Sequence, residues 1–394
     1  MRLVMGGESL LGQKTGIGQY TENLAREILK TGSINDFKFL SYGKLQDTAP
    51  LLTADPGEQK TSMAGQSNSK LLANLRGVAS RNPAAVWCYN KAMPLLERHT
   101  LRDYTDSDVF HSPNYMLANF PGKRVVTILD LSTIKHPEFH HKGMVKFVNH
   151  HIRQSIQKAD HIITISETVK SEIVEHLGVE EERITTTYLA ANSTFKPLTA
   201  EEFAKHAFAP DLEYKKYFLC ACTLEPRKNI SRLLDAYCSY RKREGDSALP
   251  LVLVGHQGWY SEELYSRILE LGIANGVRYL GYVDSSSLPI IFAGARALIF
   301  PSIYEGFGLP VLEAMQAGTA VLTSPNSAMS EVAQDAALFA EPASTEDIES
   351  KMLLLASDDT LIARLTSAGR QKSSEFSWHQ CAKQTLSVYG KLAA

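Results

Sequence analysis

The sequence lacks three features that would point to particular classes of protein. It has no run of about 18 apolar residues, so no segment is predicted to span a membrane. The apolar segment of a signal peptide is missing behind Met1. Neither sign of charge is in excess, because 41 Lys and Arg face 43 Asp and Glu, and no nucleic-acid partner is indicated. We expect a cytoplasmic protein, either free or lying on the inner face of the cell membrane.

Cysteines are also few. Five are scattered along the chain, and no second cysteine or histidine pair at ligand spacing completes a zinc site. Cys220 and Cys222 occupy alternate positions of an apolar run and should face one side of a strand. We expect reduced thiols in the core, as in most cytosolic proteins.

What the sequence does contain is an alternation of short apolar runs with segments of helical period, which predicts an α/β protein with parallel sheets. The 394 residues exceed what one core usually supports, so two sheets are expected rather than one. Strands are predicted at 3–5, 37–42, 108–112, 124–129, 161–166 and 183–189, and again at 217–222, 251–255, 277–281, 296–302, 320–324 and 336–340.

A polar stretch with two prolines, at about 190–215, should join the two halves. We therefore place the first domain at 1–195 and the second at 196–376, and we expect one more amphipathic helix at 377–394. Residues 43–70 show neither the strand nor the helix period and are rich in turn formers, which predicts a long loop.

Glu305 and Glu313 flank a glycine-rich turn between a predicted strand and a predicted helix. Such turns lie at the carboxyl end of a parallel sheet, where α/β proteins bind ligands. Gly306 and Gly308 would let the backbone approach a ligand, and the free N–H groups of the helix would bind phosphate. Glu313 could accept hydrogen bonds from a ribose, and Glu305 from a sugar. The turn therefore predicts a site for a nucleotide sugar.

Arg227 and Lys228 follow the first predicted strand of the second domain. Two adjacent cations suit a diphosphate leaving group, whose charge grows as the glycosidic bond breaks. Their charges could take the place of a divalent metal at such a leaving group, so we expect no metal or other cofactor. Asp106 and Asp108 form a D-x-D string, the competing metal motif, but it lies in a polar turn and is not expected to bind metal.

The stretch EGFGLPVLEAMQAG, with Glu305 and Glu313 eight residues apart, resembles the E-x7-E motif of retaining glycosyltransferases of family 4 (GT4). Five further motifs follow the family's usual order, namely TGIGQYTENLAREIL (15–29), HSPNYMLANF (111–120), LDLSTIKHPEF (129–139), ADHIITISE (159–167) and TLEPRKNISRLLDAY (223–237). The resemblance is to bacterial mannosyl- and rhamnosyltransferases of O-antigen and exopolysaccharide synthesis. It implies the GT-B fold: two Rossmann-like domains, a cleft between them, and a C-terminal helix that returns to the first domain.

The resemblance also implies roles for residues. The first domain would bind the acceptor and the second the nucleotide sugar. Glu305, Arg227, Lys228 and Asp130 would form the catalytic centre. The donor would contact Gly16, Gly18, Thr223, Tyr282, Gly306, Phe307, Gly308, Leu309 and Glu313. Transfer would retain the anomeric configuration by front-face attack, with no side-chain nucleophile.

Two positions depart from the family pattern. Related sequences carry histidine beside the donor sugar where this chain has Leu129, which favours a 6-deoxy sugar such as rhamnose over mannose. His111 and His136 lie nearby in the motifs, but each is expected to be a core or surface residue. The family often carries arginine near Thr223. Because of these departures, a catalytically silent binding subunit stays an alternative. A hydrolase, phosphorylase or epimerase of the same fold is another.

The implied reaction moves a hexose from a nucleoside diphosphate sugar, expected to be GDP-linked, to a saccharide or lipid-linked saccharide. Two basic stretches, 70–98 and 140–158, have the composition of amphipathic helices that lie on anionic lipid. A solvated helix face explains the same composition equally well.

Overall fold

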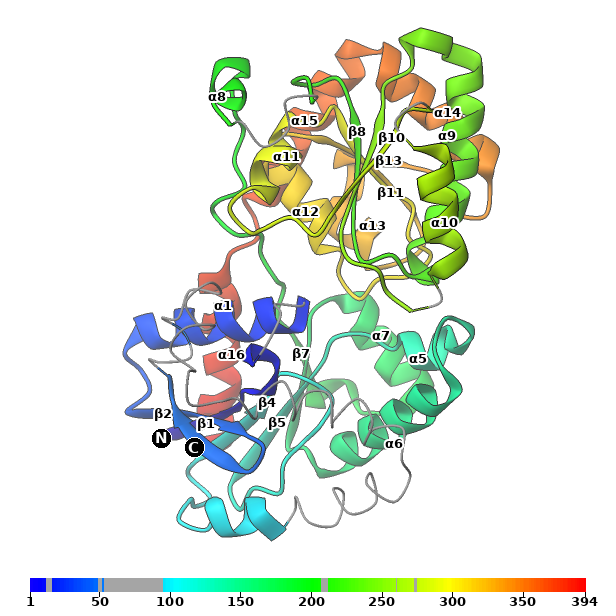
Figure 1. The fold of residues 1–394 in the computed structure, drawn as a ribbon. Coiled ribbons are helices and arrows are strands. Elements are labelled where there is room, and N and C mark those ends of the chain that lie inside the picture. Colours follow the sequence, from blue (N-terminus) through cyan, green and yellow to red (C-terminus); the bar gives the residue numbers. More distant parts are fainter. Residues whose placement is uncertain (12–15, 49–51, 53–94, 207–211, 260, 273–274) are drawn as a thin grey trace, which may run out of the picture.

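The computed structural model contains two α/β units, each built on its own sheet (Figure 1). It describes the chain apart from residues 12–15, 49–51, 53–94, 207–211, 260 and 273–274. The predicted α/β class with two sheets is confirmed, and the described strands other than that at Lys44–Asp47 fall on the runs that the sequence predicts.

The sheet of the first unit has seven strands in the order β3-β2-β1-β4-β5-β6-β7. All neighbours pair in parallel except β2 and β3, which are antiparallel. The strands are β1 (Arg2–Gly6), β2 (Asp36–Ser41), β3 (Lys44–Asp47), β4 (Val109–Ser112), β5 (Lys123–Ile128), β6 (His161–Thr164) and β7 (Ile184–Thr186).

Strand β3 corrects the prediction of a loop over 43–70. Ser41 pairs with Lys44, so Tyr42 and Gly43 form a two-residue hairpin loop. Their φ angles, 51° and 75°, are both positive, as a type I′ turn requires. The sequence analysis missed this turn because tyrosine rarely adopts a positive φ. The rest of the predicted loop lies largely outside the described residues.

The sheet of the second unit has six strands in the order β10-β9-β8-β11-β12-β13, all of them parallel. Its strands are β8 (Phe218–Ala221), β9 (Leu251–Val254), β10 (Val277–Gly281), β11 (Ala297–Phe300), β12 (Ala320–Thr323) and β13 (Leu338–Phe339).

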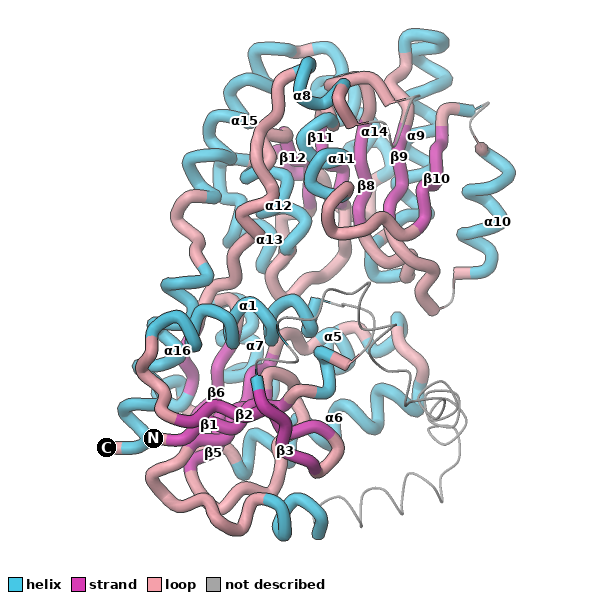
Figure 2. The backbone as a smooth tube through the Cα atoms, turned by 60° about the vertical axis from the view of Figure 1, so that its left-hand side comes forward, coloured by secondary structure: helices cyan, strands magenta, loops and turns pink. Residues whose placement is uncertain are grey.

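Helices cover both sheets (Figure 2). Those of the first unit are α1 (Gly16–Thr31), α5 (Ser132–Lys135), α6 (Lys142–Lys158) and α7 (Glu167–Leu177). Those that follow are α8 (Ala200–Ala204), α9 (Ile230–Glu244), α10 (Glu262–Leu271), α11 (Leu288–Gly294), α12 (Leu309–Gln316), α13 (Ala328–Ala333), α14 (Thr345–Ser357), α15 (Asp359–Ser373) and α16 (Trp378–Ala393).

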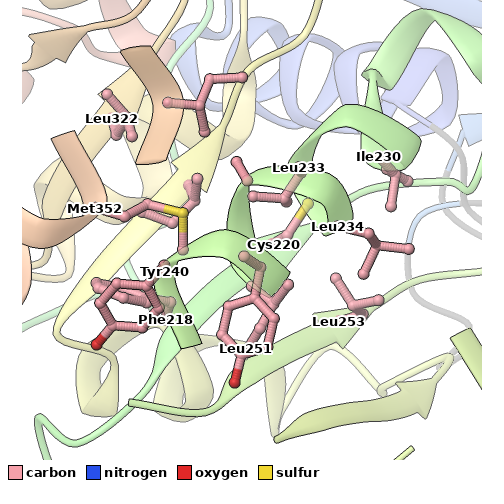
Figure 3. Close-up of a cluster of buried hydrophobic side chains, with 14 of the residues drawn as sticks. Phe218, Cys220, Ile230, Leu233, Leu234, Tyr240, Leu251, Leu253, Leu322 and Met352 are labelled. Carbon is pink, nitrogen blue, oxygen red and sulfur yellow. The ribbon is translucent and has the colours of Figure 1, made fainter. Parts of the chain in front are cut away.

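Alternate side chains of β8 pack into two different hydrophobic clusters, one on each face of the sheet. Phe218 and Cys220 point into the cluster shown in Figure 3, together with side chains of α9 and α14. Leu219 and Ala221 point to the opposite face, together with side chains of α11 and α12. A parallel strand buried on both faces needs such a continuous apolar run. The four described cysteines are free thiols, and the Sγ atoms of Cys220 and Cys222 lie 3.9 Å apart, on one side of the strand.

Helix α16 returns to the first unit and lies along α1 (Figures 1 and 2). Its Cys381 and Val388 are part of the same buried cluster as β1 and α1. The hydroxyl of Tyr389 lies 2.5 Å from Nδ1 of His111, whose Nε2 lies 2.7 Å from the Thr127 hydroxyl. Burial lowers the pKa of His111 to about 3. His111 is therefore a neutral core residue, as expected.

Candidate active site

The loops that follow strands of both sheets meet in one region, which we call the junction. It contains residues 129–140 and 165–172 of the first unit, and residues 222–229, 255–259 and 301–309 of the second. The Leu131 amide donates to the Tyr304 hydroxyl across it (3.1 Å), and the Ser166 hydroxyl donates to the Gly306 carbonyl (2.8 Å). Parallel sheets bind ligands at the carboxyl ends of their strands, so the junction is the candidate active site.

Glu305 lies at the centre of a cluster of buried charges. Its Oε2 accepts from Nη1 of Arg227 at 2.9 Å, and its Oε1 accepts from Nζ of Lys228 at 2.5 Å. The hydroxyl of Ser302 donates to the same Oε1 at 2.6 Å. The other arm of Arg227 donates to Glu225, also buried, at 2.8 Å. The sequence analysis singled out Glu305, Arg227 and Lys228, but it did not predict that they pair with one another.

Electrostatics keep Glu305 and Arg227 ionised. Burial alone would raise the pKa of Glu305, but the charges of Arg227 and Lys228 outweigh burial and hold the pKa at about 2. Burial likewise works against the charge of Arg227, yet Glu305, Asp130 and Glu225 raise its pKa. Glu305 is therefore a carboxylate that holds two cations in place.

The turn that carries the two cations is fixed by its backbone. Pro226–Lys228 forms a 3-10 turn after β8, and Asn229 follows in the left-handed region with φ 59°. The Asn229 side-chain amide donates to the carbonyls of Pro301 (3.1 Å) and Pro342 (2.7 Å). Because Pro301 begins the loop with Glu305, Asn229 ties the cationic turn to the acidic one.

Glu313 has the opposite environment. It lies on α12 with 8% of its surface exposed, and burial raises its pKa to about 7. No hydrogen bond of its carboxyl group occurs within the described part of the chain. A buried carboxyl group without a partner is costly, and such groups are concentrated at binding sites.

The structure shows why glycine is needed at two positions of the motif, for reasons that the sequence did not reveal. A Cβ on Gly306 would clash with the carbonyl oxygen of Leu129, so the close contact between the units requires glycine at this position. Gly308 has φ 93° and precedes the first turn of α12. Phe307 is 3% exposed and packs in the core cluster of the first unit, against which Leu309 also packs.

Asp130 and Leu129 lie where β5 ends. Asp130 Oδ1 accepts from the Ser132 amide at 2.8 Å, and its Cβ would lie 2.9 Å from a Cβ on Gly306. Its charge raises the pKa of Arg227, so Asp130 joins the cluster around Glu305. The Leu129 side chain packs against the core cluster of the first unit. The side chain is partly buried there, and the preference for a 6-deoxy donor stays a prediction.

The remaining predicted donor contacts are spread around the second unit and α1. Gly16 is the exposed first residue of α1, and Gly18 is buried within that helix. Thr223 is exposed directly after β8. Tyr282 is 55% exposed after β10, and its ring stacks on His256 with centroids 4.5 Å apart.

Tyr304 is a junction residue that the sequence analysis missed. Its hydroxyl donates to Oε2 of Glu172 at 2.6 Å, and Oε1 of Glu172 accepts from Lys135 at 2.6 Å. Its carbonyl accepts from Arg227, next to Glu305. Tyr304 thus links the first unit to the charge cluster. Glu172 lies 132 positions away in the sequence, so no local signal could reveal the pair.

A second carboxylate also joins the units. Glu331 of α13 accepts from the backbone amides of Glu167 (2.8 Å) and Thr168 (2.9 Å), in the first turn of α7. The free N–H groups of a helix start carry partial positive charge, which favours a carboxylate there.

Metal ligands do not gather anywhere in the described residues, where no group of three His, Cys, Asp or Glu side chains could hold an ion. Asp108 of the D-x-D string forms an ion pair with Arg2 at 2.5 Å. Burial opposes its charge, but the bonds from Arg2 and Thr105 lower the pKa of Asp108 to about 2. In the same part of the chain no helix is long and apolar enough to cross a bilayer.

Two facing α/β units with a charged junction are the architecture of GT-B glycosyltransferases, and comparison with solved structures supports this. Sucrose-phosphate synthase from Thermosynechococcus elongatus superimposes with a TM-score of 0.70 and 16% identity, over 100% of this chain and 99% of that one. Anabaena HepE in complex with UDP and glucose gives a TM-score of 0.67 and 15% identity, over 99% of each chain.

Sequence comparison identifies the family. Residues 52–193 match Glycosyltransferase Family 4, and residues 201–372 match Glycosyl transferases group 1. The chain is 33% identical over 390 residues to O-antigen chain mannosyltransferase B of Escherichia coli, covering 99% of both sequences. The chain belongs to glycosyltransferase family 4 and is a hexosyltransferase.

Proposed function

We propose that the protein transfers mannose, with retention of configuration, from GDP-mannose to a saccharide acceptor in O-antigen synthesis. The observation that carries this proposal is the pair of glutamates: Glu305 is bound to two cations, whereas the buried Glu313 has no partner within the described residues. The name of the Escherichia coli relative, which aligns over 99% of both chains, supports the sugar and the pathway.

Glu313 would bind the ribose of the donor. A carboxylate accepts hydrogen bonds from two adjacent hydroxyls, and these would replace the partners that the buried group lacks. The start of α12, close by, has no side-chain cap, and its positive dipole end would face the diphosphate. The stacked rings of Tyr282 and His256 offer a flat surface to the base.

Arg227 and Lys228 would stabilise the leaving group. In the proposed step, the bond between the sugar C1 and the diphosphate oxygen breaks, and C1 bonds to the acceptor hydroxyl on the same face. The hydroxyl proton passes to the departing diphosphate. The charge on the diphosphate grows during this step, so cations held in place by Glu305 favour the transition state over the bound donor. Asp130, beside Gly306, would complete the sugar pocket.

We place the acceptor on the first unit and the nucleotide sugar on the second. The Glu313 site, the cationic turn and the Tyr282 ring all belong to the second unit. The acceptor must then approach from the loops of the first unit that face them across the junction, around Asp130 and His136.

Contact with a membrane is a further part of the proposal. Helix α6 contains no acidic residue, and Lys142, Lys146, Arg153 and Lys158 are exposed on it together with Met144. Such a face suits anionic headgroups. The protein should co-sediment with vesicles of phosphatidylglycerol but not of phosphatidylcholine. Equal sedimentation with both would favour the solvated-face alternative. Most of the other basic stretch, 70–98, lies outside the described residues.

Transfer from several donors tests the function directly. The protein is incubated with a mannose-terminated acceptor and with GDP-mannose, GDP-rhamnose or UDP-glucose, and product is detected by mass spectrometry. We expect transfer of mannose. Release of free sugar at the same rate without acceptor would indicate a hydrolase. Donor binding without turnover on any acceptor would indicate the silent binding subunit.

A further inference from the structure

His140 is a buried histidine whose ring nitrogens have no hydrogen-bond partner within the described residues. It lies between the 3-10 turn Pro137–Phe139 and α6, and 6% of its surface is exposed. Within the described residues neither Nδ1 nor Nε2 has a hydrogen-bond partner. A buried polar atom without a partner costs free energy, and such atoms are uncommon in folded proteins. His136, in the same loop, has Glu138 as a partner at 3.2 Å.

The surroundings of His140 belong to the junction. Its ring lies against Trp259 of the second unit, with centroids 5.7 Å apart and planes 31° apart. The Trp259 indole N–H donates to the Phe139 carbonyl at 2.6 Å, so the residue that covers His140 is itself bound to the first unit. Gly258, beside the indole, is tied to the loop after β8 through a 2.9 Å bond from its amide to the Leu224 carbonyl.

The charge state of His140 follows from the same surroundings. Burial and the nearby charge of Arg227 lower its pKa, while Asp130 and Glu138 raise it less. The imidazole is therefore neutral, with one N–H donor and one acceptor nitrogen. A diphosphate offers only acceptors and would use one nitrogen of the ring. A sugar offers hydroxyls, which both donate and accept, and can satisfy both nitrogens.

We propose that His140 is a further substrate-binding residue, whose imidazole exchanges hydrogen bonds with hydroxyls of a sugar between the two units. This proposal rests on the glycosyl transfer proposed above. Trp259 covers the ring from the second unit, so the nitrogens become accessible when the units separate. Closure without a sugar leaves them unpaired, and closure on a sugar pairs them, so the sugar favours the closed state.

The sugar that His140 binds belongs either to the donor or to the acceptor, and kinetics distinguish these two cases. We compare wild type with His140→Phe, which keeps a ring against Trp259, and His140→Gln, which keeps one donor and one acceptor. His141→Phe, at the exposed neighbouring position, is the matched control. The substrates are GDP-mannose and octyl α-mannoside, and release of mannose from GDP-mannose is measured with and without acceptor.

For His140→Phe we expect kcat/KM for one sugar substrate to fall by about tenfold or more, the range for one or two hydrogen bonds. Affinity for GDP alone should stay within about twofold, because the base and diphosphate lie elsewhere. The thermal midpoint of the ligand-free protein should stay the same or rise, since two unpaired nitrogens are removed. His140→Gln should recover part of the loss.

If the loss appears in KM for GDP-mannose and in its hydrolysis without acceptor, the hydroxyls belong to the transferred sugar. If it appears only in KM for octyl α-mannoside, they belong to the acceptor. Either result supports the proposal. Unchanged kcat/KM for both substrates overturns it, and so does a loss that comes with a lowered thermal midpoint and no recovery in His140→Gln. Failure of the proposed function itself would differ, because wild type would then not transfer mannose, whether or not it binds GDP.

Discussion

Glu305 and Glu313 lie eight residues apart at one turn, yet their carboxyl groups have pKa values on opposite sides of the ordinary value. Two cations hold the pKa of Glu305 at about 2, against burial. Burial without any cation raises that of Glu313 to about 7. The same motif thus contains one carboxylate, Glu305, that is paired with cations, and one carboxyl group, Glu313, that has no partner within the described residues.

The first prediction concerns nucleotide binding. Glu313→Ala should weaken binding of free GDP by about 1.5–3 kcal/mol, because a charge-assisted hydrogen bond to the ribose is lost. Isothermal calorimetry on the folded variant measures this. Glu270→Ala, an exposed glutamate on α10, should bind GDP like wild type. Equal affinity of Glu313→Ala and wild type would remove Glu313 from the ribose site.

The second prediction concerns stability and pH. Between pH 4.5 and about 7 the unfolded chain releases the Glu313 proton while the folded chain keeps it. The free energy of unfolding of wild type therefore falls by up to about 3 kcal/mol over this interval. The decrease is complete once the pH exceeds the pKa of Glu313 in the folded protein. Glu313→Gln stays neutral, so its thermal midpoint relative to wild type should rise as the pH increases through this interval.

Glu305→Gln is the comparison for that experiment. The pKa of Glu305 is depressed, so its ionised form contributes stability above about pH 4.5, which is lost only as the pH falls toward 2. The difference between Glu305→Gln and wild type should therefore be large but constant from pH 5 to 8. If both variants responded to pH alike, the opposite environments of the two glutamates would be refuted.

The third prediction concerns the leaving group. Arg227→Ala should lower kcat by about 100- to 1,000-fold, the range for a group that stabilises charge developing in the transition state. KM for the donor should change less, because the bound donor carries less charge on its leaving oxygen. Steady-state kinetics separate the two constants. Arg267→Ala, which removes a surface ion pair with Asp235, is the control. A larger effect on donor binding than on kcat would contradict the proposed role.

The fourth prediction concerns metals. If Arg227 and Lys228 neutralise the diphosphate, turnover should be the same in EDTA as in Mn²⁺. The measurement is the initial rate of transfer by protein dialysed against chelator. Loss of activity that Mn²⁺ restores would show that the two cations are not sufficient.

The fifth prediction concerns the contact between the units. Gly306→Ala would drive a methyl group into the Leu129 carbonyl and force the junction apart. Displacement of about 1 Å at an active site can cost about a hundredfold in rate, and we expect a loss of that size. Circular dichroism should show both units folded. Gly390→Ala on α16, where a Cβ meets nothing within 4 Å, should retain full activity. Full activity of Gly306→Ala would show that the junction tolerates the methyl group.

Much of this protein follows from local sequence. The apolar runs predict the strands because a parallel strand covered on both faces needs continuous apolar residues, as in β8. The E-x7-E stretch and five further motifs in the family's order predict the family by resemblance, since each motif is a short run of neighbouring residues. The comparisons confirm the family and the fold.

Tertiary structure alone decided what these residues contact. The partner of Arg227 is Glu305, 78 positions away, and the partner of Tyr304 is Glu172, 132 positions away. Position 306 must be a glycine because the Leu129 carbonyl approaches it from the other unit. Charge pairing, clashes and unpaired polar atoms such as those of His140 depend on which distant segments meet. Local propensity does not reveal which distant segments meet, because these contacts depend on how two complete α/β units pack against each other.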